Sequence, residues 1–181
     1  MSFVAVLVGS LKRDSINLKL AREIERLSGD RLQYRYLSAG DLPMFNEDLE
    51  PQLPQPVLEF KQTLSSAQAV LIVTPEHNRS MPAVVKNAID WGSRPFSDNA
   101  WRNKPLGIIG ISPSRTGTAV AQSQLRSIFT NLGTLVMSSP EAYLVYHDGL
   151  FGPDGRLTDP GTQRFVASYA DNIVAWVNRF S

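Results

Sequence analysis

The residues best suited to chemistry lie in a polar segment that follows the first apolar run of the chain. This segment reads Gly9-Ser10-Leu11-Lys12-Arg13-Asp14-Ser15-Ile16-Asn17 and leads directly into a helix-like pattern. Backbone N–H groups at a helix N-terminus favour a bound phosphate, and hydroxyls, an amide and the cations Lys12 or Arg13 add donors. Neither G-x-x-x-x-G-K-[ST] nor G-x-G-x-x-G occurs here. The segment predicts either a phosphate site of another type or an ordinary polar turn with a serine cap.

Two further polar segments follow apolar runs. One is Thr74-Pro75-Glu76-His77-Asn78-Arg79-Ser80-Met81-Pro82, and the other is Ser112-Pro113-Ser114-Arg115-Thr116-Gly117-Thr118. The two prolines of the former indicate a rigid platform whose amide groups suit a flat polar ring. The latter again combines hydroxyls, a glycine and one arginine. Three such segments favour a single nucleotide-sized site, provided that the fold brings them together.

Alternating strand-like and helix-like patterns supply the elements that must position these segments. Strands are expected over 3–8, 32–37, 69–74 and 106–111, with a fifth beginning at 134–136, and helices over 16–27, 56–66, 82–91, 118–132 and 158–180. Either Ser15 or Asp14 can cap the first helix, and either Thr158 or Asp159 the last. This pattern predicts a doubly wound α/β fold. Ligands in such folds bind beyond the carboxyl ends of the strands, where all three polar segments begin.

Composition limits the chemistry. The chain has 181 residues, a formal net charge of +1, no cysteine and two histidines. Its length suits one domain over 1–181, and its charge does not indicate a nucleic-acid partner. Without cysteine there is no thiol chemistry or thiolate metal site, and two histidines make another metal site unexpected. Neither a targeting segment nor a membrane span is apparent, so a cytoplasmic protein is expected.

Together the motifs resemble the NAD(P)H-dependent FMN reductase family of flavodoxin-like proteins, especially its quinone and chromate reductase branch. The matching segments are 9–17, Thr74-Pro75-Glu76-His77-Asn78 and Lys86-Asn87-Ala88-Ile89-Asp90-Trp91. The resemblance implies an α/β flavodoxin-like three-layer sandwich with a five-stranded parallel sheet of order 2-1-3-4-5. It also implies non-covalently bound FMN, reduction by NADH or NADPH, and a homodimer or homotetramer.

The resemblance also implies site residues. Those expected to hold the FMN phosphate are Ser10, Leu11, Lys12, Arg13, Asp14, Ser15, Ile16 and Asn17. Those expected beside the isoalloxazine ring are Pro75, Glu76, His77, Asn78, Arg79 and Ser112. Family members often have tyrosine at the position of His77 and an aromatic residue near Arg79, which affects the ring environment and substrate preference. Arg79 and Arg115 are candidates for dinucleotide phosphates or an anionic acceptor, the alternative being solvated surface arginines.

The expected reaction needs no catalytic side chain, because the cofactor carries the chemistry. Hydride would pass from NAD(P)H to FMN, and two electrons then to a quinone or another small acceptor such as chromate or an azo or nitro compound. A small domain with one cleft favours a ping-pong cycle. The alternatives are a flavodoxin-type electron carrier, an FMN-binding redox sensor, and a reductase that supplies free reduced flavin. Flavodoxin-type electron carriers are acidic proteins, whereas this chain has a net charge of +1.

Overall fold

The apolar runs of the sequence form a single sheet in a computed structural model, which describes residues 2–180. Its strands are β1 (Val4–Val8), β2 (Tyr34–Tyr36), β3 (Ala69–Val73), β4 (Pro105–Ser112), β5 (Leu135–Val136) and β6 (Tyr143–Val145). Every residue of β3 and β4 is buried, as in parallel sheets that helices cover on both faces. The strands predicted from continuous apolar runs are therefore confirmed, with ends that shift by one or two residues.

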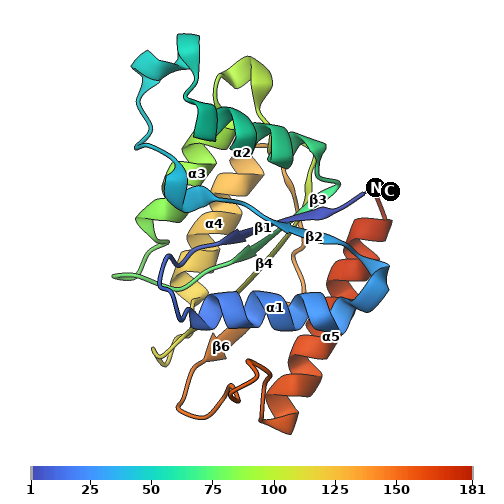
Figure 1. The fold of residues 1–181 in the computed structure, drawn as a ribbon. Coiled ribbons are helices and arrows are strands. Elements are labelled where there is room, and N and C mark those ends of the chain that lie inside the picture. Colours follow the sequence, from blue (N-terminus) through green and yellow to red (C-terminus); the bar gives the residue numbers. More distant parts are fainter. Residues whose placement is uncertain (1, 181) are drawn as a thin grey trace.

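Five helices cover the two faces of the sheet (Figure 1). They are α1 (Ile16–Ser28), α2 (Gln55–Ser66), α3 (Ala83–Ser93), α4 (Ala119–Asn131) and α5 (Pro160–Asn178). The apolar sides of α1 and α5 pack on one face, and those of α2, α3 and α4 pack on the other. The protein is thus a three-layer α/β sandwich. Within residues 2–180, no helix is long and apolar enough to cross a membrane.

The helix ends follow the predicted capping chemistry. The Ser15 hydroxyl accepts a hydrogen bond from the backbone N–H of Leu18, and the Asp159 carboxylate accepts one from Thr162. The first helix ends at Gly29, whose φ of 56° lies in the region that glycine enters without steric cost. Of the two candidates at each N-terminus, Ser15 and Asp159 are the caps.

The sheet has the predicted order, β2-β1-β3-β4-β5, with parallel pairing. In the centre, β1 and β3 pair from Val4 opposite Ala69 to Val8 opposite Val73. The chain leaves β1 into α1 on one face and leaves β3 into α3 on the opposite face. These two connections therefore diverge at the carboxyl edge, and such a switch point is where doubly wound sheets bind ligands.

The fifth position of the sheet is split into two short strands, which the sequence did not predict. β5 pairs with the start of β4, and β6 pairs with Gly110, Ile111 and Ser112 at its end. Between them Pro140 has no N–H to donate to a ladder. Two α4 side chains bind this connection, with Arg126 Nη1 donating to the Met137 carbonyl at 2.7 Å and Gln122 Nε2 donating to the Ala142 carbonyl at 2.8 Å.

Candidate active site

Three connections meet at the carboxyl edge of the sheet. We call them the first loop (residues 9–15, after β1), the second loop (residues 74–82, after β3) and the third loop (residues 113–118, after β4). They lie at the left of Figure 1, where the N-termini of α1 and α4 also point. The three polar segments of the sequence are therefore brought together as predicted.

Two glycines allow this close approach. A Cβ atom added to Gly9 would lie 2.8 Å from Val85 Cγ2 and 3.0 Å from Thr74 Oγ1. One added to Gly110 of β4 would lie 2.1 Å from the carbonyl oxygen of Thr74 and 2.4 Å from Thr118 Oγ1. Both distances at Gly110 are shorter than a non-bonded contact permits. The second and third loops thus depend on a β4 residue without a side chain.

The first loop offers unpaired donors at the N-terminus of α1. Within residues 2–180, Ser10, Leu11, Lys12 and Arg13 make no hydrogen bond. The oxygen of the Ser15 hydroxyl accepts from the Leu18 N–H at 3.2 Å, which leaves its hydrogen available to another acceptor. This set of backbone and hydroxyl donors, with two exposed cations, fits the phosphate of FMN.

The side chain of Asn17 lies elsewhere than predicted. It is buried, its Nδ2 donates to the Ile111 carbonyl at 3.0 Å, and its Oδ1 accepts from the Ile111 N–H at 3.2 Å. The amide fixes the start of α1 against β4 instead of facing the first loop. Asp14 is also paired, with its carboxylate 2.7 Å from Lys19 Nζ, and this hydrogen bond lowers the pKa of Asp14. We therefore assign Asn17 to positioning the helix.

The second loop turns sharply at its tip. The backbone N–H groups of His77 and Ser80 each donate to the other residue's carbonyl at 2.9 Å. The residues between them, Asn78 and Arg79, have φ values of 51° and 61°, as in the type I′ turn that closes tight hairpins. The side chains of His77 and Asn78 are exposed at this tip. In the described part of the chain Asn78 makes no hydrogen bond, so its amide and N–H remain available to a ligand.

Glu76 joins the second loop to the third. Its Oε2 accepts hydrogen bonds from the backbone N–H groups of Val120 at 2.9 Å and Ala121 at 3.1 Å, and its side chain is 4% exposed. Thr118, which precedes α4, provides no side-chain cap and instead accepts from Gln122 Nε2. The carboxylate from the second loop therefore supplies the cap of α4.

Arg79 reinforces the same junction. Its Nη1 donates to Thr116 Oγ1 at 2.7 Å and lies 3.4 Å from Glu76 Oε1. The next residue, Ser80, also binds α4, because its Oγ donates to Gln124 Oε1 at 2.7 Å. The guanidinium expected to contact a dinucleotide phosphate is thus held between the second and third loops.

We expect replacement of Glu76 by alanine to destabilise the protein by about 1–3 kcal/mol, because two helix N–H groups and Arg79 lose their acceptor. FMN affinity should fall as well, since the second loop is no longer tied to α4. Urea denaturation and FMN titration measure the two effects. Glu76→Gln is the matched control, because its amide oxygen can still accept, and it should lose about half as much stability. Equal losses in the two variants would contradict a capping role.

The third loop leaves Arg115 available. Ser112 is buried, and its Oγ accepts from the Ser114 N–H at 3.2 Å, so the hydroxyl hydrogen can still point to a ligand. Ser114 and Thr116 hydroxyls lie 2.9 Å apart. Arg115 is exposed and makes no hydrogen bond or ion pair within the described residues. It remains a candidate contact for an anionic substrate.

The segment Lys86 to Trp91 has a structural role. Asn87 Oδ1 accepts from the Phe45 N–H at 2.8 Å, and its Nδ2 donates to the Pro43 carbonyl at 2.9 Å. Trp91 Nε1 donates to the same carbonyl at 2.7 Å. Lys86 Nζ contacts both carboxylate oxygens of Asp90 at 2.8 Å. This motif therefore fastens residues 42–45 to α3.

Known proteins share both sequence and fold with this chain. Residues 3–148 match the family described as NADPH-dependent FMN reductase. The chain is 39% identical to a 2-hydroxy-1,4-benzoquinone reductase from a Burkholderia species, covering 96% of this chain and 95% of that protein. It is 40% identical to a quinone reductase from Pseudomonas putida, with 96% and 94% covered.

Solved structures of other proteins share the fold of this chain. FerB, a flavoenzyme NAD(P)H:(acceptor) oxidoreductase from Paracoccus denitrificans, superposes with a TM-score of 0.94 at 42% identity, covering 99% of each chain. A flavodoxin variant from Pseudomonas aeruginosa superposes with a TM-score of 0.61 at 20% identity, covering 97% and 98%. This second similarity concerns the fold alone.

Proposed function

The chain belongs to the NADPH-dependent FMN reductase family, and from this premise we propose that it transfers two electrons from NADH or NADPH to a quinone. FMN is its cofactor. When bound, FMN supplies the redox chemistry, accepting two electrons from the nicotinamide and giving them to the acceptor. The overall reaction, NAD(P)H + H⁺ + quinone → NAD(P)⁺ + quinol, balances without a further reactant. The observation that supports this most directly is the convergence of the three loops at the switch point of the sheet.

For the phosphate of FMN we propose the first loop as the binding site. The unpaired N–H groups from Ser10 to Arg13, the Ser15 hydroxyl and the cations of Lys12 and Arg13 would hold it. Asn17 contributes indirectly, because its side chain fixes the start of α1 against β4. Leu11, Asp14 and Ile16 contribute through their backbone only.

For the flavin ring we propose contacts with Pro75 to Asn78 and with Ser112. Glu76 and Arg79 set the position of this surface, because they bind the second loop to α4 and to Thr116. Unpaired backbone N–H groups at the tip of the second loop would stabilise negative charge on the reduced cofactor. His77 and Asn78 are exposed there, where a nicotinamide or quinone must approach.

The acceptor is proposed as a quinone because two relatives near 40% identity, which match 96% of this chain, are named for quinone reduction. Chromate and azo or nitro compounds remain secondary candidates as small acceptors. We also propose a cytoplasmic homodimer or homotetramer. The exposed Phe96 and Met44, at 73% and 74% exposure, are candidates for a subunit contact.

The test is to purify the protein, record its flavin spectrum and follow NADPH oxidation with and without 1,4-benzoquinone. We expect a yellow protein and a quinone-dependent rate. One shared cleft predicts ping-pong kinetics, in which oxidised dinucleotide leaves before the quinone binds, and hence parallel double-reciprocal plots. Intersecting plots would exclude this order. A protein that gains no flavin spectrum with added FMN would overturn the proposal.

A further inference from the structure

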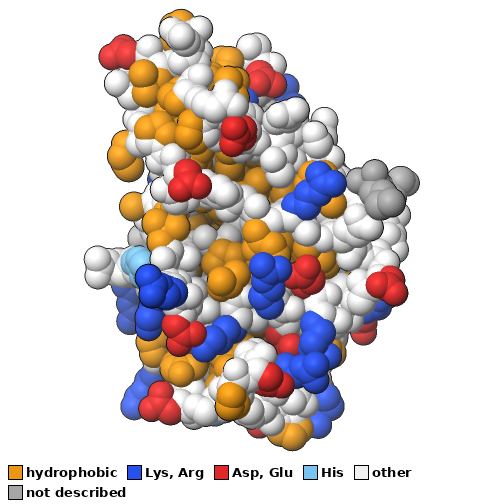
Figure 2. Space-filling view, in the orientation of Figure 1, with side chains coloured by type: hydrophobic (Ala, Val, Ile, Leu, Met, Phe, Trp, Pro, Cys, Tyr) orange, Lys and Arg blue, Asp and Glu red, His pale blue; other side chains and the backbone are white. Residues whose placement is uncertain are grey.

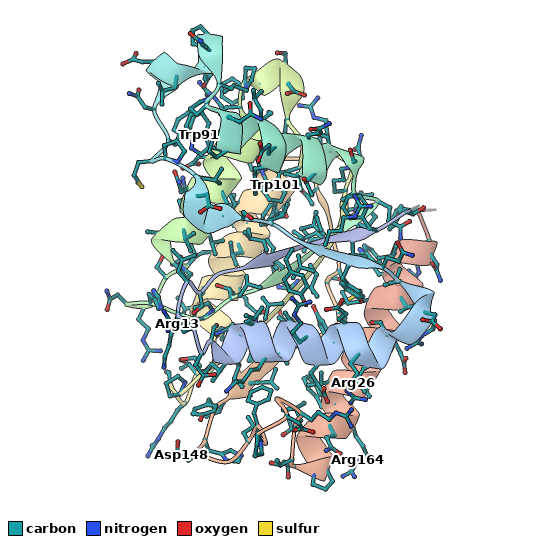
Figure 3. All side chains as sticks on the ribbon, viewed as in Figure 1. Arg13, Arg26, Trp91, Trp101, Asp148 and Arg164 are labelled. Carbon is teal, nitrogen blue, oxygen red and sulfur yellow. The ribbon has the colours of Figure 1, made fainter. Side chains whose placement is uncertain are left out.

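A groove with a surplus of positive charge runs along α1, beside the first loop. Its volume is about 440 Å³, and its far wall is formed by residues 154–156. Figure 2 shows Lys and Arg side chains gathered over α1. In Figure 3, Arg13 lies at the N-terminal end of this helix and Arg26 near its other end. Because α1 begins at Ile16, the helical part of this span, from Ile16 to Arg26, is about 15 Å long at 1.5 Å per residue.

The cations of the groove outnumber its carboxylates. Five basic residues line it, Arg13, Lys19, Arg22, Arg26 and Arg156, against the three acids Asp14, Glu23 and Asp154. Each acid is already paired, by Lys19 at 2.7 Å, by Arg26 at 2.8 Å and by Arg156 at 3.5 Å. The Arg22 guanidinium binds Glu25, which does not line the groove, and Arg13 has no partner within residues 2–180. The groove therefore has room and charge for an anion.

Two other hollows of the described surface lack this surplus. The one between β2 and α2 contains Asp41 and Glu59 and no cation. The one between α3 and α4 contains Lys86 and Arg94, but Lys86 is paired with Asp90, and Arg94 with Glu47 and Glu50. Of these three hollows, the one along α1 is therefore the most favourable for a phosphate group.

From this distribution we infer that the groove binds the adenosine 2′-phosphate end of NADPH. This inference rests on the proposed function, which requires a dinucleotide whose nicotinamide reaches the loops. The groove opens at Arg13, Asp14 and Ser15, which also belong to the first loop. The groove thereby distinguishes NADPH from NADH, which lacks the 2′-phosphate.

The experiment titrates the FMN-loaded protein calorimetrically with adenosine 2′,5′-bisphosphate, with adenosine 5′-monophosphate and with inorganic phosphate. The variant is Arg156→Glu, which lies outside the first loop and reverses one charge of the groove. The matched control is Arg164→Glu on α5, an exposed arginine that does not line the groove (Figure 3).

Wild-type protein should bind the bisphosphate about 10-fold more tightly than the monophosphate. Arg156→Glu should weaken bisphosphate binding about 10-fold and monophosphate binding far less, while Arg164→Glu changes neither. Equal weakening by the two variants, or equal wild-type affinity for the two nucleotides, would overturn the inference. Inorganic phosphate binding as tight as that of the bisphosphate would indicate a general anion site and also overturn it.

These outcomes are separable from failure of the proposed function. If the wild-type enzyme oxidises NADPH with a quinone but binding is insensitive to Arg156, only the groove assignment fails. If it oxidises neither NADH nor NADPH, the proposed function fails, whatever the nucleotide affinities are.

Discussion

Replacing Ser15 by aspartate is expected to weaken FMN binding roughly 100-fold while leaving the fold intact. Ser15 caps α1 through its side-chain oxygen, and aspartate is an equally good N-cap whose charge suits a helix N-terminus. The new carboxylate would face the cofactor phosphate. Repulsion of about 2.8 kcal/mol, plausible for like charges a few ångströms apart near a protein surface, corresponds to that loss of affinity. Fluorescence titration of apoprotein with FMN measures it.

Riboflavin, which has the same ring and no phosphate, provides the control ligand. Its affinity should differ by less than about 2-fold between wild-type protein and Ser15→Asp, and urea denaturation of the two apoproteins should coincide. Ser15→Ala is a second control that separates the cap from the charge. It removes the helix cap, which costs about 1 kcal/mol of stability, but adds no negative charge. If riboflavin and FMN lost affinity equally, the phosphate would not lie at the first loop.

The second large effect is expected from Gly110→Ala, which should destabilise the protein by about 3 kcal/mol, the upper end of the usual cost of overpacking, and reduce FMN binding. The added methyl group would lie 2.1 Å from the Thr74 carbonyl oxygen and 2.4 Å from Thr118 Oγ1. A backbone carbonyl cannot rotate away, so β4 and the second and third loops must separate. Urea denaturation gives the stability change, and FMN titration reports whether the loops still form the site.

Gly107→Ala on the same strand is the matched substitution. Its methyl group would also lie 2.1 Å from a neighbour, but that neighbour is Cδ1 of Ile173, the end of a flexible side chain. Rotation of this side chain limits the cost to about 1–2 kcal/mol. Loss of FMN binding in Gly107→Ala to the extent seen in Gly110→Ala would show that general destabilisation, not separation of the loops, causes the effect.

The strands and helix ends could be predicted well because they depend on residues that are close together in the sequence. The continuous apolar runs that form β1, β3 and β4 are buried on both faces. The hydroxyl of Ser15 caps α1 by accepting from the N–H of Leu18, only three residues on. β6 was missed because three residues, Tyr143 to Val145, give no recognisable period. Pairing of this strand depends on β4, more than thirty positions earlier.

Candidate site residues were predicted less completely, because their partners are distant in sequence. Glu76 caps a helix 44 positions further on, and Asn17 bonds Ile111, 94 positions away. A buried polar side chain must find a partner, but residue type alone does not say which. The motif containing Asn87 and Trp91 was assigned to the family correctly, whereas its function as a clamp on residues 42–45 required the structure.

The split of the fifth sheet position into β5 and β6 limits aggregation by pairing of strands between molecules. At one edge of the sheet β2 has three residues, and at the other β5 has two and β6 three. Exposed strand edges recruit other chains when they are long and flat. The eight-residue β4 is shielded along its outer side by two short strands instead of one long one. Within residues 2–180, intermolecular strand addition thus finds no extended template at either edge of the sheet.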